Sequence, residues 1–250
     1  MKNQFFSLRP FVRVAIPVIL VLTLIGCGFV ASVPWIRNAE QNHVVNIGDS
    51  IFALSGEIQE FLHTYSGTTF RRYAVSGAEL TGGIMAPSVA SQYSIAKMDD
   101  PNIDTILMDG GGNDILLPVL TSFDPYNCRT QWYQFGRLSS RCRNFIDDIY
   151  VECVDLLNQM AADDVDKVVY LGYYYTKNTW LLRLANLKQA IDYGNLRLSQ
   201  ACNYSAVDCA FVDPRPVITN SDILVDAIHP TRSGSEKIAN LIWPVLGPRL

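Results

Sequence analysis

A serine between a strand and a helix is the first residue of this chain that could act as a nucleophile. Ser50 ends the segment Gly48-Asp49-Ser50, which follows a predicted buried strand at 43–47 and precedes a predicted helix at 52–64. A serine at such a turn lies at the carboxyl end of its strand, where the amino end of the next helix favours developing negative charge. An ordinary turn with a helix cap has the same sequence, so a nucleophile here needs further support.

The chain has 3 histidines, and His229 is the one that could serve Ser50 as a base. It stands in a loop three residues after Asp226, whose carboxylate can hold the imidazole in one tautomer and stabilise the imidazolium that forms in catalysis. His63 falls on the helix that follows Ser50, about 20 Å away at the rise of an α-helix. His43 begins the strand whose opposite end carries the serine. The alternative for His229 is a surface histidine beside a helix start.

Donors for an oxyanion are expected after two further strands. The predicted strand at 105–108 runs into Gly110-Gly111-Gly112-Asn113-Asp114, where glycines let the backbone approach a ligand and the Asn113 amide can donate a hydrogen bond. The strand at 69–75 leads to Gly77, whose N–H would lie at the same edge. A turn or a phosphate-binding loop also explains the glycines, although no Gly-Lys-Ser/Thr sequence follows them.

These segments belong to an alternation of predicted strands and helices. Helices are also predicted at 84–98, 145–160, 181–202 and 233–246, and strands at 167–173 and 210–212. About five strand–helix units in succession favour a parallel sheet with helices on both faces. In open parallel sheets chemistry gathers beyond the carboxyl ends of the strands, which is where the serine, the glycines and the asparagine fall.

Taken in order, these segments resemble the four sequence blocks of the SGNH (GDSL-like) hydrolase superfamily. The match spans residues 43–246 and includes His229-Pro230-Thr231-Arg232-Ser233-Gly234, and it departs at Ile51-Phe52, where the family commonly has Leu-Ser. The resemblance implies an α/β fold, a three-layer α/β/α sandwich with a flavodoxin-like parallel sheet of about five strands. We interpret Asp49 and Asp114 as structural caps.

The resemblance also implies a serine ester hydrolase (esterase, lipase or acetyl-esterase) that works through an acyl-enzyme. It makes Ser50 the nucleophile, His229 the general base and Asp226 the residue that orients the base. The N–H groups of Ser50 and Gly77 and the side chain of Asn113 would form the oxyanion hole. Two alternatives remain: a non-catalytic cell-envelope binding protein on the same fold, and an acyltransferase, which would pass through the same acyl-serine.

The amino-terminal residues predict export and attachment to a membrane. Three basic residues precede an apolar run at 14–25, which is the layout of an export signal. The run ends in Leu24-Ile25-Gly26-Cys27, which resembles the lipobox of bacterial lipoproteins, in which the cysteine carries the lipid. Alternatively, residues 14–36 form an uncleaved transmembrane helix, which needs about 20 apolar residues. Both interpretations place the remaining chain in the cell envelope, periplasmic or extracellular.

The predicted organisation is an anchor at 1–36, a short polar linker at 37–42 and one hydrolase domain at 43–250. In an oxidising compartment Cys128–Cys142 and Cys202–Cys209 are plausible disulfides. Cys153 then remains as an unpaired thiol, buried on a helix.

Composition limits the partners. The chain is 49% hydrophobic and 18% charged, which allows a sizeable core, and its net charge of −4 without a basic tract argues against nucleic-acid binding. No cysteine–histidine spacing indicates zinc, and no cofactor is expected. The expected substrate is an ester, of a lipid or of an O-acylated envelope glycan. Aromatic residues in the loop at 121–140 and at Tyr173-Tyr174-Tyr175 could bind an acyl chain, stack on a sugar or pack under the loop.

Overall fold

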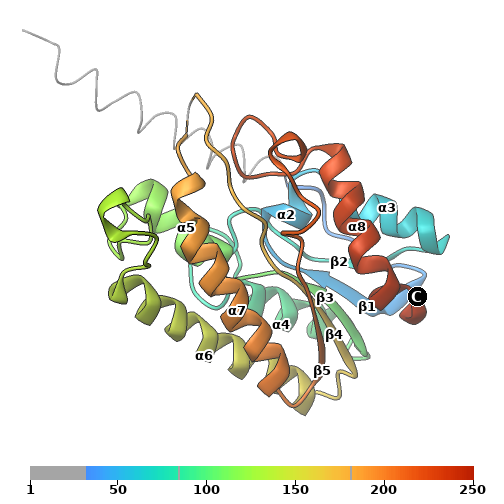
Figure 1. Cartoon of the computed structure of the whole chain (residues 1–250). Coiled ribbons are helices and arrows are strands. Elements are labelled where there is room, and N and C mark those ends of the chain that lie inside the picture. The colour runs from blue at the N-terminus through green and yellow to red at the C-terminus, as the bar shows by residue number, and fades with distance from the viewer. Residues whose placement is uncertain (1–31, 84, 181) are drawn as a thin grey trace, which may run out of the picture.

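Five parallel strands form the sheet in the computed structural model, which describes residues 32–83, 85–180 and 182–250. The strands are β1 (Gln41–Ile47), β2 (Phe70–Arg72), β3 (Thr105–Met108), β4 (Lys167–Leu171) and β5 (Asp208–Val212). Their order is β2-β1-β3-β4-β5 (Figure 1), which is the flavodoxin-like order that the sequence predicted. The order reverses between β1 and β3, so the crevice beyond these two strands is the expected ligand site of such a sheet.

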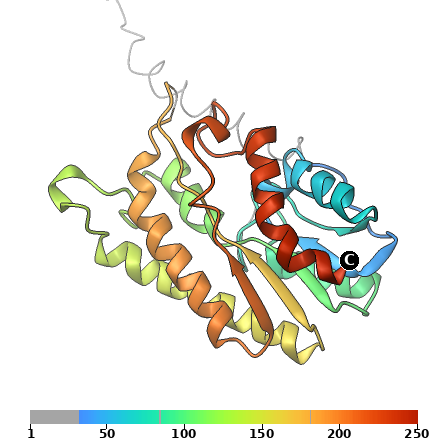
Figure 2. The same ribbon diagram turned by 45° about the vertical axis from the view of Figure 1, so that its right-hand side comes forward.

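Helices cover both faces of the sheet and complete the predicted three-layer α/β/α sandwich (Figures 1 and 2). They are α2 (Ser50–Ala53), α3 (Glu57–Ser66), α4 (Val89–Asp99), α5 (Gly112–Thr121), α6 (Ser140–Ala162), α7 (Lys188–Tyr204) and α8 (Arg232–Leu246), with short 3-10 turns at Trp132–Gln134, Ala185–Leu187, Asn220–Asp222 and Gly247–Arg249. α3 and α8 pack on one face, and α4, α6 and α7 pack on the other.

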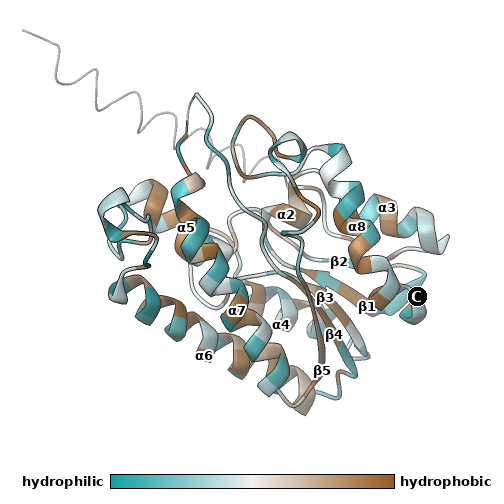
Figure 3. Ribbon diagram, in the orientation of Figure 1, coloured by the Kyte–Doolittle hydropathy of each residue, from teal (hydrophilic) through white to brown (hydrophobic). Residues whose placement is uncertain are grey.

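Successive residues of each strand point to opposite faces and so supply two separate cores. Val44 and Leu107 join the apolar cluster under α3 and α8, whereas Val45 and Ile106 join the cluster under α4, α6 and α7. A strand buried on both sides must be apolar throughout, as β3 is, and Figure 3 shows the central strands in the hydrophobic colour.

Two helical regions differ in kind from the sequence prediction, and the other helices differ only in their bounds. The predicted helix at 52–64 is broken into α2 and α3 because Gly56 adopts a left-handed conformation, with φ 69°, which an α-helix cannot contain. Helix α5 was not predicted. It begins at Gly112, the last residue of the glycine run, and contains Pro118, two features that normally argue against a helix.

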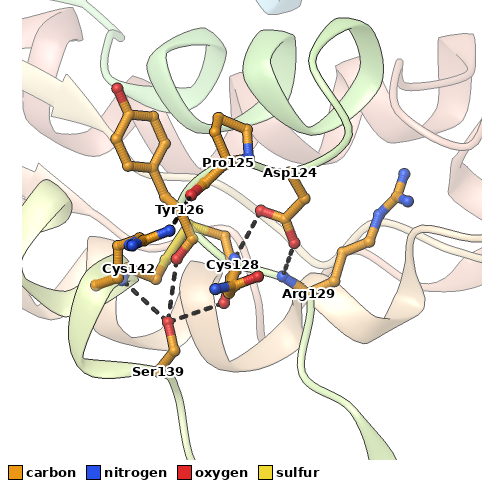
Figure 4. Close-up of a disulfide and its surroundings, with 9 residues drawn as sticks. Asp124, Pro125, Tyr126, Cys128, Arg129, Ser139 and Cys142 are labelled. Atoms are coloured by element: carbon orange, nitrogen blue, oxygen red, sulfur yellow. Dashed lines mark hydrogen bonds between the residues drawn. A yellow bond between two sulfur atoms is a disulfide. The ribbon is translucent and has the colours of Figure 1, made fainter.

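Two disulfides join the pairs of cysteines that the sequence suggested. Cys202–Cys209 links α7 to β5, and Cys128–Cys142 links the loop after α5 to the start of α6. Figure 4 shows how hydrogen bonds support the second bond: the Asp124 carboxylate accepts from the N–H groups of Cys128 and Arg129, at 2.7 and 2.8 Å. Cys153 is buried and unpaired on α6, as predicted.

The segment before β1 packs on the domain. Ile36 pairs with Arg72 of β2, and the Trp35 ring lies 5.5 Å from the Tyr73 ring. β1 itself begins at Gln41, so the last two residues of the predicted linker at 37–42 belong to the sheet. Within the described ranges, no helix is long and apolar enough to cross a bilayer. Cys27 and the predicted anchor as far as residue 31 lie outside those ranges.

Candidate active site

The serine lies where the sequence placed it, at the first position of α2 directly beyond β1. Gly48 has φ 145°, and a Cβ atom there would overlap the Asp109 carboxylate, so the turn requires glycine. Gln92 of α4 holds this glycine twice: its Oε1 accepts from the Gly48 N–H at 2.7 Å and its Nε2 donates to the carbonyl at 2.9 Å. The backbone that carries Ser50 is therefore fixed from beneath.

Two buried carboxyl groups lie under this turn. Asp49 caps α2 by accepting from the Ile51 N–H at 2.9 Å, as interpreted from the sequence, and its own N–H donates to Asp109 at 2.6 Å. The Tyr173 hydroxyl donates to the second oxygen of Asp49 at 2.8 Å. Burial and the neighbouring Asp49 raise the pKa of Asp109 well above its ordinary value, so this carboxyl group binds a proton at a higher pH than an exposed aspartate does.

Asp109→Asn is expected to make the stability of the protein less dependent on pH. A carboxyl group with a raised pKa in the folded state adds stability at low pH that is lost as the pH rises through that pKa. An asparagine can still accept from the Asp49 N–H, but it does not titrate. As the pH rises from 4 to 8, the melting temperature should therefore fall less in the Asp109→Asn variant than in the wild type. The exposed Asp148→Asn serves as control, and parallel curves for Asp109→Asn and wild type would contradict the assignment.

The predicted base and its orienting residue are joined as expected. His229 Nδ1 lies 2.8 Å from an oxygen of Asp226, whose other oxygen accepts from the N–H groups of Ile228 and His229 at 2.9 and 3.0 Å. Burial alone would raise the pKa of Asp226, but the hydrogen bond from His229 and the charge of that ring lower it on balance. Asp226 is thus held as a carboxylate aimed at Nδ1.

The other ring nitrogen of this histidine is free. Nε2 of His229 is buried and has no hydrogen-bond partner among the described residues. Burial raises the pKa of Asp49, and the charge of His229 acts against that rise, so the ring lies within electrostatic range of the Ser50 turn. A buried nitrogen without a partner next to a serine turn is available to accept a proton.

Two of the three expected oxyanion donors, Asn113 and Gly77, are joined through a hydrogen bond. Asn113 stands in the first turn of α5, and its amide donates one N–H to the carbonyl oxygen of Ala78 at 3.0 Å. The second N–H of that amide remains for a ligand. Gly77 precedes Ala78 in a left-handed conformation, with φ 81° and open space beside it. The hydrogen bond therefore ties Asn113 to the Gly77 turn, although Gly77 does not line the cavity described next.

A cavity with about 860 Å³ of empty space, including the part open to solvent, joins the serine to the asparagine. Its lining includes Ser50, Asn113 and Ile228, the residue directly before His229. Tyr173 and Tyr174 also line it. The structure thus brings three of the predicted segments to one hollow at the switch point of the sheet, which is the usual place for a ligand in this architecture.

The aromatic residues proposed for substrate binding divide into separate groups. Tyr126 stacks on Phe145, with ring centroids 3.7 Å apart, and therefore packs under the loop. Tyr175 bonds Asp192 through its hydroxyl. The other aromatic side chains of the loop point to solvent, namely Phe123, Trp132, Tyr133 and Phe135. Of the aromatic residues suggested for substrate binding, only Tyr173 and Tyr174 reach the cavity.

The Tyr173 ring also explains why position 112 is occupied by glycine. A Cβ atom on Gly112 would lie 2.5 Å from two carbons of the Tyr173 ring, so the ring covers this glycine directly. The sequence analysis missed Asp109 as a part of the site, and it named Tyr173 only as an aromatic residue that could bind substrate. A signal for Asp109 exists in the sequence, since it follows β3 at the edge that carries the other site residues, but a single acid after a strand is common.

The remaining histidines lie elsewhere. His63 lies on α3 with its ring against Phe70, centroids 4.6 Å apart, in a surface hollow shared with Glu40 and Arg72. His43 lies in β1 at the end away from the serine. Both positions agree with the exclusion made from the sequence.

No protein-family model matches the chain, and no curated protein matches it in sequence. Solved structures do match it. A GDSL-like lipase from Bacteroides thetaiotaomicron has a TM-score of 0.56 at 16% identity, with 86% of this chain and 93% of that one covered. A lipase from a goat rumen metagenome has a TM-score of 0.58 at 14% identity, with 80% of this chain and 95% of that one covered. An acetylxylan esterase from Geobacillus stearothermophilus has a TM-score of 0.53 at 15% identity, with 82% of this chain and 93% of that one covered. The chain therefore has the fold of the SGNH hydrolase superfamily.

Proposed function

We propose that this protein is a serine ester hydrolase in which Ser50 is the nucleophile, His229 the general base and Asp226 its orienting partner. The observation that carries the proposal is the shared cavity: Ser50 and Asn113 line it together with the residue that precedes His229. The free Nε2 of His229 supports the same assignment. A serine is a weak nucleophile at neutral pH and needs such a base beside it.

The proposed reaction has two halves. His229 Nε2 takes the hydroxyl proton of Ser50 as Oγ attacks the ester carbonyl carbon, and the tetrahedral oxyanion accepts hydrogen bonds from Asn113 and the N–H groups of Ser50 and Gly77. The imidazolium then gives its proton to the departing alcohol, which leaves an acyl-serine. Water attacks the acyl group in the same manner, and the free acid leaves.

We also propose that the enzyme is exported and held at a membrane, through a lipid on Cys27 or through a helix at 14–36. The sequence pattern of the amino terminus supports this location, and the two disulfides are of the kind that persists in oxidising compartments. Esters of membrane lipids or of acylated envelope glycans would be within reach of a domain tethered there.

Covalent labelling of the full-length protein in mild detergent tests the proposal. A fluorophosphonate, which reacts with activated serines, is expected to attach to the peptide that contains Ser50, as found by mass spectrometry. The same preparation should hydrolyse p-nitrophenyl butyrate, and Ser50→Ala should neither label nor turn over this ester. A wild-type protein that neither labels nor hydrolyses any p-nitrophenyl ester would instead favour a binding protein on this fold.

A further inference from the structure

The cavity beside the serine extends away from the turn and between three helices. Figures 1 and 2 both show α5, α6 and α7 grouped on one side of the molecule. Each helix contributes aliphatic side chains to the cavity wall, among them Ile115, Leu116, Ile146, Ile149, Ile191 and Leu198. The hollow is thus polar at the Ser50 end and hydrocarbon-lined between the helices.

Several polar side chains along this wall are already engaged within the protein. Asn195 accepts from the Tyr173 N–H at 2.9 Å and donates to the carbonyl oxygen of the same residue at 2.7 Å. The Tyr173 hydroxyl donates to Asp49, and the Thr176 hydroxyl donates to a main-chain carbonyl. The Arg197 guanidinium lies 2.7 Å from a carboxylate of α6. A sugar ring buried here would lose its hydration without gaining equivalent hydrogen bonds, whereas an alkyl chain needs none.

We propose that this cavity is an acyl-chain pocket, and that the substrates are esters of fatty acids with medium to long chains. The inference rests on the proposed function, because it places the ester carbonyl at Ser50 and the acyl chain among α5, α6 and α7. An acetyl group would leave most of the apolar wall uncovered.

A larger side chain at position 194 would narrow this pocket. Gly194 lies on α7 in the cavity wall, and the nearest atom to a Cβ added there is the end of Ile115 on α5, at 4.0 Å. Its backbone is helical, so an alanine or leucine fits the main chain without strain. A leucine at 194 would project toward α5 and narrow the space between the two helices. Leu196, two residues along the same helix, is 51% exposed and provides a control position.

Chain-length profiles of p-nitrophenyl esters test the pocket. For the wild type, kcat/KM should rise from acetate to decanoate by up to about fourfold for each added methylene that the wall covers. In Gly194→Leu the ratio of decanoate to acetate turnover should fall at least about tenfold, with a smaller fall in Gly194→Ala. Leu196→Phe should keep the wild-type ratio. Highest turnover on acetate, with a decline as the chain lengthens, would overturn the proposal and indicate a site for small acyl groups.

A binding measurement separates this inference from the proposed function. Decanoic acid titrated calorimetrically into Ser50→Ala should bind, and it should bind at least about tenfold more weakly to the Ser50→Ala, Gly194→Leu double variant. Binding without any wild-type ester turnover would retain the pocket and reject the hydrolase. Acetate turnover that depends on Ser50, without decanoate binding, would retain the hydrolase and reject the pocket. If the leucine variants do not fold, the alanine variant provides both comparisons.

Discussion

Alanine at Ser50, alanine at His229 and both changes together are expected to lower kcat for an activated ester to the same floor, about 10⁴- to 10⁶-fold below the wild type. The reason is that the serine and histidine act in one step. Without the base, the hydroxyl of Ser50 is a poor nucleophile, and without the hydroxyl the free Nε2 of His229 has no proton to accept. The second change therefore removes nothing further.

Steady-state kinetics on p-nitrophenyl butyrate with the two single variants and the double variant measure this non-additivity. His63→Ala is a suitable control because that ring packs against Phe70 and lines a different hollow from the one beside Ser50. Losses that multiply in the double variant would mean that the two residues act independently. A His229→Ala enzyme with more than about a tenth of wild-type activity would remove this residue from the mechanism.

Asp226→Asn is expected to lower kcat by about 10⁴-fold while leaving the fold intact. In the wild type the Asp226 carboxylate lies 2.8 Å from Nδ1, which selects the tautomer with its lone pair on Nε2. The asparagine can keep one oxygen on the N–H groups of residues 228 and 229, and it then presents an amide NH₂ to Nδ1. That arrangement favours the opposite tautomer, with the proton on Nε2, where it prevents proton transfer from Ser50.

The matched control is Asp222→Asn in the same loop. Asp222 accepts from Lys237 at 2.8 Å and from Thr219, and these contacts keep its pKa at about 2 although burial opposes this, so its role is structural. Asp222→Asn should lower the melting temperature with little effect on kcat. Asp226→Asn should lower kcat with little effect on the melting temperature. A loss below about tenfold in Asp226→Asn would show that another group orients the histidine.

The sheet could be predicted closely because parallel strands buried on both faces are apolar throughout. β3 was located to the residue, since Thr105–Met108 are buried and the apolar run ends abruptly at Asp109 and the glycines that follow. The break at Gly56 could not be predicted, because a single glycine is tolerated in many helices and the left-handed turn depends on the packing around it. α5 could not be predicted because its first residue is a glycine and it contains Pro118, and both residue types disfavour a helix.

The candidate site was predicted in its individual residues more completely than in its surroundings. Ser50, Asn113 and His229 each follow a recognisable local signal, a strand end or a loop acid. The carboxyl pair and the cavity have no such signal: Asp109 matters only because Gly48 lies against it, and the apolar wall combines residues from 112 to 198 that meet only when three helices pack together. These features depend on tertiary structure, which periodicity does not encode.

The ring of Tyr173 over Gly112 has a consequence for sequence variation in relatives of this chain. One side chain touches the start of the asparagine helix and, through its hydroxyl, holds the carboxylate beneath the serine. A larger residue at 112 can be accommodated only if 173 shrinks, and a smaller residue at 173 leaves Asp49 without that donor. Positions 112 and 173, which are far apart in the chain, should therefore covary as a pair.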